Sequence, residues 1–181
     1  VMLVILPVAW IYLLPREVTH FIKSIITSIS FTSNFYFHYS GNVFGEIGSF
    51  YKPFFHTWSL SILIQFYILY SFILVLSFKY FKKIIIYLII LGIIGSLFLA
   101  NWGSKTHPSF NFFVLPTRGW ELLIGSLFAY CEIKIGYRIK NKKLNFILPL
   151  IGIGLIIYSI LFFNDKMLHP SFNTIVPVLG T

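Results

Sequence analysis

Charged residues are scarce in this sequence. They make up 10% of its 181 residues, whereas an average soluble domain contains about 25%. Hydrophobic residues reach 57% and aromatic residues 20%, which is the reverse of the composition that keeps a chain disordered. The composition therefore excludes a disordered chain and argues strongly against a water-soluble globular fold. We expect the apolar surface to be covered by membrane lipid.

Metal ligands and paired cysteines are also lacking. The sequence has one cysteine, Cys131, which cannot form an internal disulfide. The five histidines are scattered and show no metal-ligand spacing. We therefore expect neither redox chemistry nor a bound metal.

Acidic residues are so few that the formal charge is +9, from 14 Lys and Arg against five Asp and Glu. Nucleic-acid-binding proteins share such an excess of positive charge. Here, however, the basic residues lie in short loops between apolar runs and form no stripe interleaved with stacking aromatics. Nucleic acid is therefore not expected as a partner, and the charges fit membrane topology better.

The sequence begins without a methionine, a basic leader region or a signal-peptidase site, and an apolar run starts at Val1. Its last residues, 174–181, open a new apolar segment. We therefore expect an internal fragment of a larger membrane protein, truncated at both ends.

Apolar segments of membrane-spanning length recur along the chain, and a spanning helix needs about 20 such residues. Glycine, proline and charged residues separate the candidates, which are residues 1–14, 21–37, 57–78, 84–100, 116–130 and 144–163, with another beginning near residue 174. Segment 21–37 carries polar residues on one helical face, so it fits an interfacial or bundle-buried helix as well as a span. The sequence predicts an all-α fold, a polytopic transmembrane helical bundle of five or six spans that forms a single domain over residues 1–181.

Lysine and arginine cluster in two of the loops, residues 79–83 and 134–143. Cytoplasmic loops carry an excess of these residues, so both loops are predicted to face the cytoplasm. Residues 16–53, 101–115 and 164–173 are then expected on the outer side.

Small polar residues recur at helical spacing in the segment that follows residue 56. Thr57, Ser61 and Gln65 are spaced i, i+4, i+8 and share one helix face. This stripe either forms hydrogen bonds to a neighbouring helix or faces a substrate. His56, just before the helix, could act as a general base or be a hydrogen-bonded residue of the helix end. Trp58 is expected to anchor the outer membrane boundary.

An ionisable pair opens the segment 116–130. Arg118 and Glu121 are spaced i, i+3, so their side chains can reach each other. Ionisable residues in membrane segments pair with one another or line a cavity. The pair is therefore either a structural ion pair at the outer rim or a group that contacts a ligand.

Several of these segments together resemble a known family. Residues 53–61, which read PFFHTWSLS, and the following Gln65, Phe66 and Tyr67 are similar to the HTWSLSVEEQFY block of acyltransferase family 3. These proteins are membrane acyltransferases of the O-antigen acetylase type. Residues 33–37 (SNFYF), 115–125 (LPTRGWELLIG) and 179–181 (LGT) also match the family in order and rough spacing.

The resemblance implies a larger bundle in the bacterial inner membrane. It would move an acyl group, usually acetyl from cytoplasmic acetyl-CoA, to an envelope carbohydrate such as lipopolysaccharide O-antigen, exopolysaccharide or peptidoglycan. The residues that carry over as shaping the acceptor or donor pocket are His56, Trp58, Ser59, Gln65, Arg118, Trp120 and Glu121.

This sequence departs from the family in two ways. The family's catalytic histidine and its arginine partner lie in a first helix that would precede Val1, so no catalytic residue is assigned and the fragment by itself is expected to be inactive. Where the family has Val-Glu-Glu, this sequence has Ile62, Leu63 and Ile64. Two alternatives therefore stay open: a degenerate acyltransferase remnant, and a non-enzymatic polysaccharide exporter or flippase whose polar residues line a translocation route.

Overall fold

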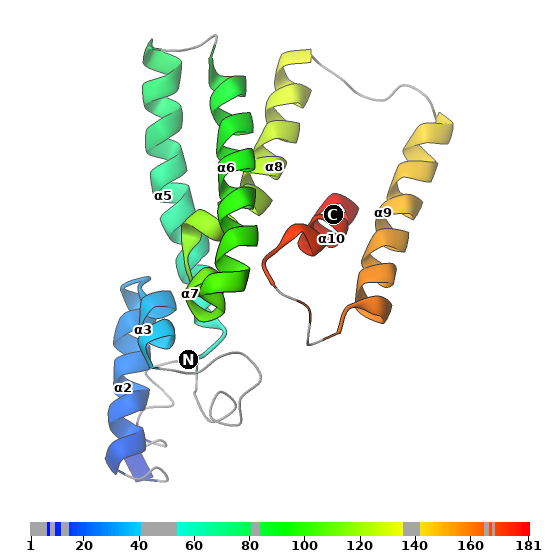
Figure 1. Cartoon of the computed structure of the whole chain (residues 1–181). Coiled ribbons are helices and arrows are strands. Elements are labelled where there is room, and N and C mark those ends of the chain that lie inside the picture. The colour runs from blue at the N-terminus through cyan, green and yellow to red at the C-terminus, as the bar shows by residue number, and fades with distance from the viewer. Residues whose placement is uncertain are drawn as a thin grey trace. The chain divides into compact units, whose positions relative to one another are not determined.

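The computed structural model describes residues 7, 10–11, 15–40, 54–80, 84–135, 142–164, 167 and 169–181. Figure 1 shows the helices and labels them. The elements are α2 (Pro15–Ile29), α3 (Ser33–Tyr39), α5 (Thr57–Tyr80), α6 (Ile85–Thr106), α7 (Pro108–Phe113), α8 (Leu115–Ile135), α9 (Lys142–Phe162), the 3-10 helix η1 (Phe172–Thr174) and α10 (Ile175–Gly180). No strand occurs in these ranges. The predicted all-α fold is therefore confirmed for the described residues.

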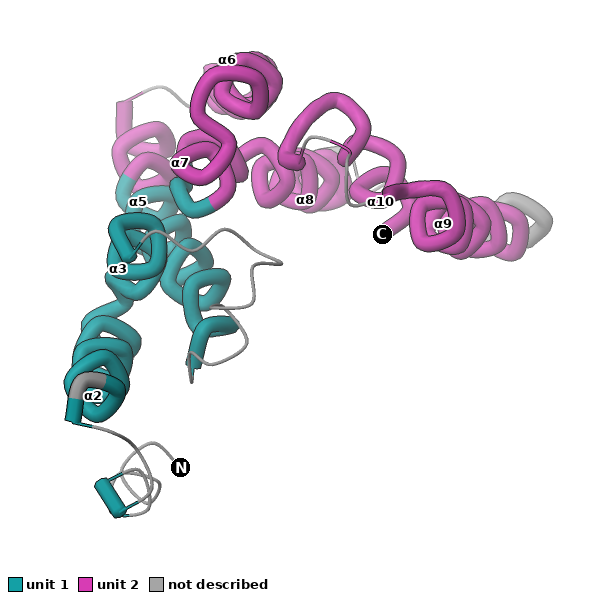
Figure 2. Tube along the Cα trace, turned by 60° about the horizontal axis from the view of Figure 1, so that its bottom comes forward, with its two compact units in different colours: residues 1–72, 113–115 teal, residues 73–112, 116–181 magenta. Residues whose placement is uncertain are grey.

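The chain divides into two compact units, which are coloured separately in Figure 2. Residues 1–72 and 113–115 form the first unit, and residues 73–112 and 116–181 form the second. The chain passes between the units within α5 and again near the junction of α7 and α8. Each unit is therefore described by itself.

Within the part of the chain that the structure describes, two helices are long and apolar enough to cross a membrane, Thr57–Tyr80 and Ile85–Thr106. Few side chains along either helix are buried, and Phe72 on α5 and Phe98 on α6 are exposed. A third apolar stretch, Phe146–Phe162 within α9, is shorter. The larger count of five or six spans stays a prediction. Most of the candidate segment 1–14 and the basic loop residues 81–83 and 136–141 lie outside the described residues, as does the orientation that depends on them.

The segment 21–37 is not one continuous helix. α2 ends in a left-handed turn at Phe31, whose φ is 54°. The N–H of Thr32 donates to the carbonyl oxygen of Thr27 (2.9 Å) and that of Phe31 to the carbonyl oxygen of Ser28 (3.3 Å). This pair of bonds is the Schellman arrangement that ends helices, usually with glycine in the left-handed position. The alternative of a single span over 21–37 is therefore wrong.

Before this break, α2 buries one of its faces. This part of the segment therefore fits the alternative of a helix buried in the bundle. Val18, Phe21 and Ile25 are buried at three- and four-residue spacing, which is the pattern of a helix that packs along one side. The Phe21 ring lies against Phe54, with 5.7 Å between ring centroids. This contact packs α2 against the turn that precedes α5.

The second unit contains a close backbone crossing between α9 and α10. A Cβ atom added at Gly152 would lie 2.6 Å from the carbonyl oxygen of Gly180, and one at Gly180 would lie 2.8 Å from the carbonyl oxygen of Gly152. Small residues allow such an approach between membrane helices. Glycine at these two positions therefore lets α10 pack against α9.

Gly152→Ala should lower the melting temperature of the purified full-length protein, because the new methyl group meets the α10 backbone. Overpacking of this kind costs about 1–3 kcal/mol. Gly154→Ala is the matched control on the same helix, because a Cβ atom there meets nothing within 4 Å. The control should be neutral or stabilising by up to about 1 kcal/mol, since alanine favours helix more than glycine does. Equal melting temperatures for the two variants would contradict the crossing.

Candidate functional site

The polar stripe of α5 is paired with the α2–α3 hairpin inside the first unit. Thr57 Oγ1 lies 2.7 Å from Ser28 Oγ and 3.1 Å from Ser33 Oγ, and Ser61 Oγ lies 2.7 Å from Ser33 Oγ. All four hydroxyl-bearing residues are buried. Buried hydroxyls need such partners, because a hydroxyl that gives up its hydrogen bonds to water without replacing them lowers the stability of the fold. Of the two alternatives for this stripe, the structure therefore favours hydrogen bonding between helices.

Gln65, the third residue of the stripe, forms hydrogen bonds to two residues of the α2–α3 hairpin. Its Nε2 donates to Phe31 O (2.8 Å) and to Asn34 Oδ1 (3.0 Å). Asn34, which is fully buried, donates from Nδ2 to the carbonyl oxygen of Phe113 (3.0 Å). Sequence reasoning missed Asn34 as a site residue, although an asparagine directly before the aromatic run of the family-like SNFYF segment is a signal that could have found it.

The residues around His56 divide into exposed and buried ones. His56 lies exposed in the turn before α5, and the exposed Ser59 donates from Oγ to its carbonyl oxygen (2.9 Å). Trp58 is 8% exposed and meets the Phe113 ring edge to face, with 5.6 Å between ring centroids. The Trp58 ring therefore packs inside this unit, and its expected place at the outer membrane boundary stays a prediction.

Arg118 and Glu121 form the pair that their spacing predicted, in the first turns of α8. Arg118 Nη1 lies 4.0 Å from Glu121 Oε2, and the side chains are 21% and 28% exposed. Arg118 Nε also donates to the carbonyl oxygen of Phe112 (3.1 Å), and its guanidinium carbon lies 4.6 Å from the centre of the Phe112 ring. The guanidinium is thus fixed by α7, while both charged groups keep access to solvent.

Trp120 lies in the core of the second unit and is 0% exposed. Its backbone N–H donates to Ser96 Oγ (3.0 Å), and Ser96 Oγ donates to the carbonyl oxygen of Pro116 (2.6 Å). Trp120 Nε1 has no hydrogen-bond partner among the described residues. These contacts join the start of α8 to α6, so the structure places Trp120 in helix packing.

Asn111 of α7 joins three parts of the second unit. Its side-chain Nδ2 donates to the carbonyl oxygens of Ala100 (3.0 Å) and Pro170 (3.2 Å). Its backbone carbonyl oxygen accepts a hydrogen bond from Thr117 Oγ1. Asn111 is buried. It therefore fixes the end of α6, the start of α8 and the segment before η1 to one another.

His169 lies beside Pro170 in that segment and is half-buried. Its ring stacks on Phe163, with 5.7 Å between centroids and 27° between planes. Partial burial lowers the pKa of His169 below its ordinary value, and the positive charge of Arg118 lowers it further. Both effects favour the neutral form of the imidazole, which has one nitrogen donor and one nitrogen acceptor.

The residues carried over by resemblance belong to two different units. His56, Trp58, Ser59 and Gln65 lie in the first, whereas Arg118, Trp120 and Glu121 lie in the second. Among the residues with a described position, no three of His, Cys, Asp or Glu gather as metal ligands. The expected absence of a metal stays a prediction.

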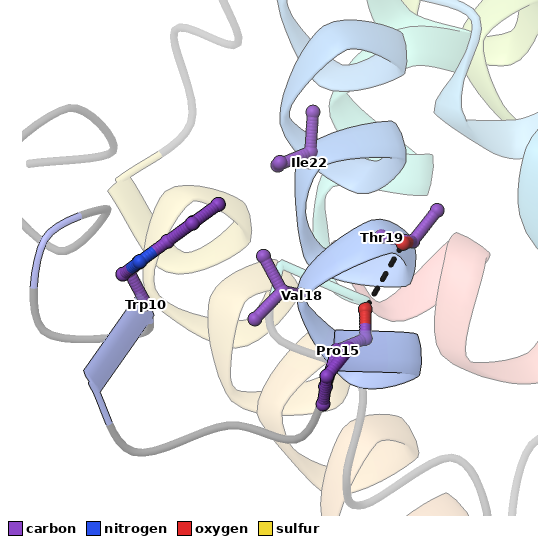
Figure 3. A pocket seen from close by; sticks show the side chains of 5 residues that line it. All are labelled: Trp10, Pro15, Val18, Thr19 and Ile22. Atoms are coloured by element: carbon purple, nitrogen blue, oxygen red, sulfur yellow. Dashed lines mark hydrogen bonds between the residues drawn. The ribbon is translucent and has the colours of Figure 1, made fainter.

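A cavity of about 340 Å³ lies beside the start of α2, lined by Trp10, Pro15, Val18, Thr19 and Ile22 (Figure 3). Its lining is mostly apolar, and the hydroxyl of Thr19 donates to the carbonyl oxygen of Pro15 (3.0 Å). None of the predicted site residues lines it.

Comparisons with known proteins give little direct guidance. An uncharacterized protein of Haemophilus influenzae strain Rd is 29% identical over 168 residues, and the match covers 88% of this chain and 68% of that protein. No protein-family model and no solved structure match the chain.

Proposed function

We propose that this chain is part of a membrane O-acyltransferase. It would move an acyl group, with acetyl-CoA as the cytoplasmic donor, to a carbohydrate of the bacterial envelope. The protein would be a polytopic bundle in the inner membrane, with five or six spans in these residues. Its partners would be membrane lipid and the acceptor glycan.

One observation carries this proposal. Two segments that resemble the acyltransferase family, residues 33–37 and residues 53–61 with 65–67, are separated in the sequence. They are bonded to each other through Ser33 with Ser61 and Asn34 with Gln65. The residues that carry the resemblance are therefore also those that hold this unit together. A chance match of short motifs gives no reason for such pairing.

The residues support a role in shaping a substrate pocket rather than in the acyl-transfer step itself. That step needs a base to activate a sugar hydroxyl and a group to stabilise the developing oxyanion. By resemblance, the base is a histidine that would precede Val1. Leu63, at the position of the family's first glutamate, can neither carry charge nor accept a proton. Arg118 and Glu121 are charged and partly exposed, so they can bind a polar acceptor.

The exporter alternative receives less support. A translocation route would need the polar stripe of α5 to face a passage, whereas Thr57, Ser61 and Gln65 are all bonded to the α2–α3 hairpin.

Deleting the gene in its native host tests the proposal. The ester-linked acyl content of purified envelope polysaccharide should fall, and the full-length gene supplied in trans should restore it. Accumulation of glycan inside the cells with unchanged acyl content would instead indicate an exporter. If neither quantity changes, the proposed enzymatic function is rejected and the chain is a degenerate acyltransferase remnant.

A further inference from the structure

The cavity beside the start of α2 lies within the first unit and is lined mostly by apolar side chains. Val18 and Ile22 are four positions apart on one face of α2, and Val18 projects toward Trp10 (Figure 3). Pro15 and Thr19 complete the lining. The volume of about 340 Å³ falls within the range of small-molecule sites, which are mostly hydrophobic cavities of roughly 300–1,000 Å³. The cavity is therefore large enough to hold part of a ligand.

The lining favours a hydrocarbon over a sugar or a nucleotide. No charged side chain is among the described residues that surround the cavity. The single hydroxyl hydrogen of Thr19 is already donated to the carbonyl oxygen of Pro15 (3.0 Å). The indole N–H of Trp10 is the one other side-chain donor among the five lining residues. A polar ligand would lose its hydrogen bonds to water there with few replacements, whereas a hydrocarbon gains stability from each apolar surface that leaves water.

The surroundings of the cavity indicate which hydrocarbon reaches it. α2 packs into its own unit through Phe21, whereas Glu17, His20 and Lys23 are exposed. Ionisable side chains that do not face a protein interior or a water-filled cavity lie outside the hydrocarbon layer of a membrane. Trp10 is 69% exposed, and tryptophan is enriched at the level of the lipid headgroups. We therefore expect the cavity to lie where the headgroups of a bilayer meet its acyl chains.

We propose that this cavity binds an acyl chain of a membrane phospholipid. The acyl chain passes the exposed Trp10 ring and lies against Val18 and Ile22, while the headgroup stays at the surface. The two described helices that are long enough to cross a membrane would surround the protein with phospholipid, which is then the most abundant hydrocarbon near the cavity. The inference is independent of the proposed acyl transfer, so either can fail without the other.

Cavity-filling substitutions test the proposal. Ile22→Trp places a larger apolar side chain in the cavity, and Thr19→Phe does so from an exposed position, where it disturbs packing less. Ile26→Trp is the matched control, because Ile26 lies one turn further along α2, is 59% exposed and is not among the residues that line the cavity. Native mass spectrometry measures the binding of palmitoyl-oleoyl-phosphatidylethanolamine to the full-length, detergent-solubilised proteins after size-exclusion chromatography has isolated the folded fraction.

Ile22→Trp and Thr19→Phe should each bind the phospholipid about tenfold more weakly than the unmodified protein, because the loss of about two buried methylene groups has an effect of this size. Ile26→Trp should bind normally. Lysophosphatidylethanolamine, which has one acyl chain, should compete with the phospholipid, whereas glycerophosphoethanolamine, which has the same headgroup and no acyl chain, should not. The inference is overturned if the unmodified protein binds no phospholipid, if either folded cavity-filling variant binds normally, if all three variants lose affinity equally, or if glycerophosphoethanolamine competes.

Discussion

Arg118→Ala should reduce acyl transfer by the full-length protein roughly 10- to 100-fold while lowering its abundance far less. A hydrogen bond to a charged group is worth about 1.5–3 kcal/mol, which corresponds to this range of rates. The Arg118 guanidinium is already placed by Phe112, and both charges of the pair remain partly exposed. We therefore expect the loss of the Arg118 side chain to weaken binding of the proposed ligand more than it weakens helix packing. The measurement is ester-linked acyl groups per glycan, beside protein abundance in the same membranes.

Two variants accompany this measurement. Lys105→Ala removes the same charge from an exposed position at the end of α6 in the same unit, and it should leave acyl transfer unchanged. Glu121→Gln keeps the shape of the side chain but removes its charge, so we expect an intermediate loss. If Arg118→Ala lowers abundance as much as acyl transfer, the pair has a folding role and the ligand-binding role is rejected.

Asn34→Ala should destabilise the full-length protein by about 2–4 kcal/mol. Asn34 is fully buried, and its loss removes its hydrogen bonds to the carbonyl oxygen of Phe113 and to the Gln65 amide. Each buried group left unsatisfied costs about 1–3 kcal/mol. In a chain of this size, 1 kcal/mol shifts the melting temperature by roughly 2–4 °C. Thermal melting in detergent should therefore show a fall of roughly 4–16 °C.

A double-mutant cycle separates this bond from the loss of apolar contact. Gln65→Ala should also destabilise, and the combination with Asn34→Ala should cost clearly less than the sum, because both substitutions remove the same hydrogen bond. Thr19→Ala, at an exposed position on α2, should change the melting temperature little. Additive effects of Asn34→Ala and Gln65→Ala would show that the two side chains act independently.

The sequence by itself determined the features that depend on composition and on spacing along one helix. A 57% hydrophobic, 10% charged chain has long apolar runs, and these form the helices of the structure. The face shared by Thr57, Ser61 and Gln65 and the contact of Arg118 with Glu121 follow from 3.6 residues per turn. Such local geometry is the same in any tertiary arrangement.

Only the tertiary structure decided which groups those side chains meet. The stripe bonds to Ser28, Ser33 and Asn34, which lie 24 to 31 positions away along the chain, and no periodicity specifies partners at that separation. The sequence also did not predict the helix end at Phe31, because glycine is the residue that usually occupies this left-handed position. Asn111 likewise bonds to the carbonyl oxygen of Pro170, 59 positions away along the chain. These contacts depend on how helices pack, because a buried polar group takes whichever partner lies within reach once the apolar surfaces have closed around it.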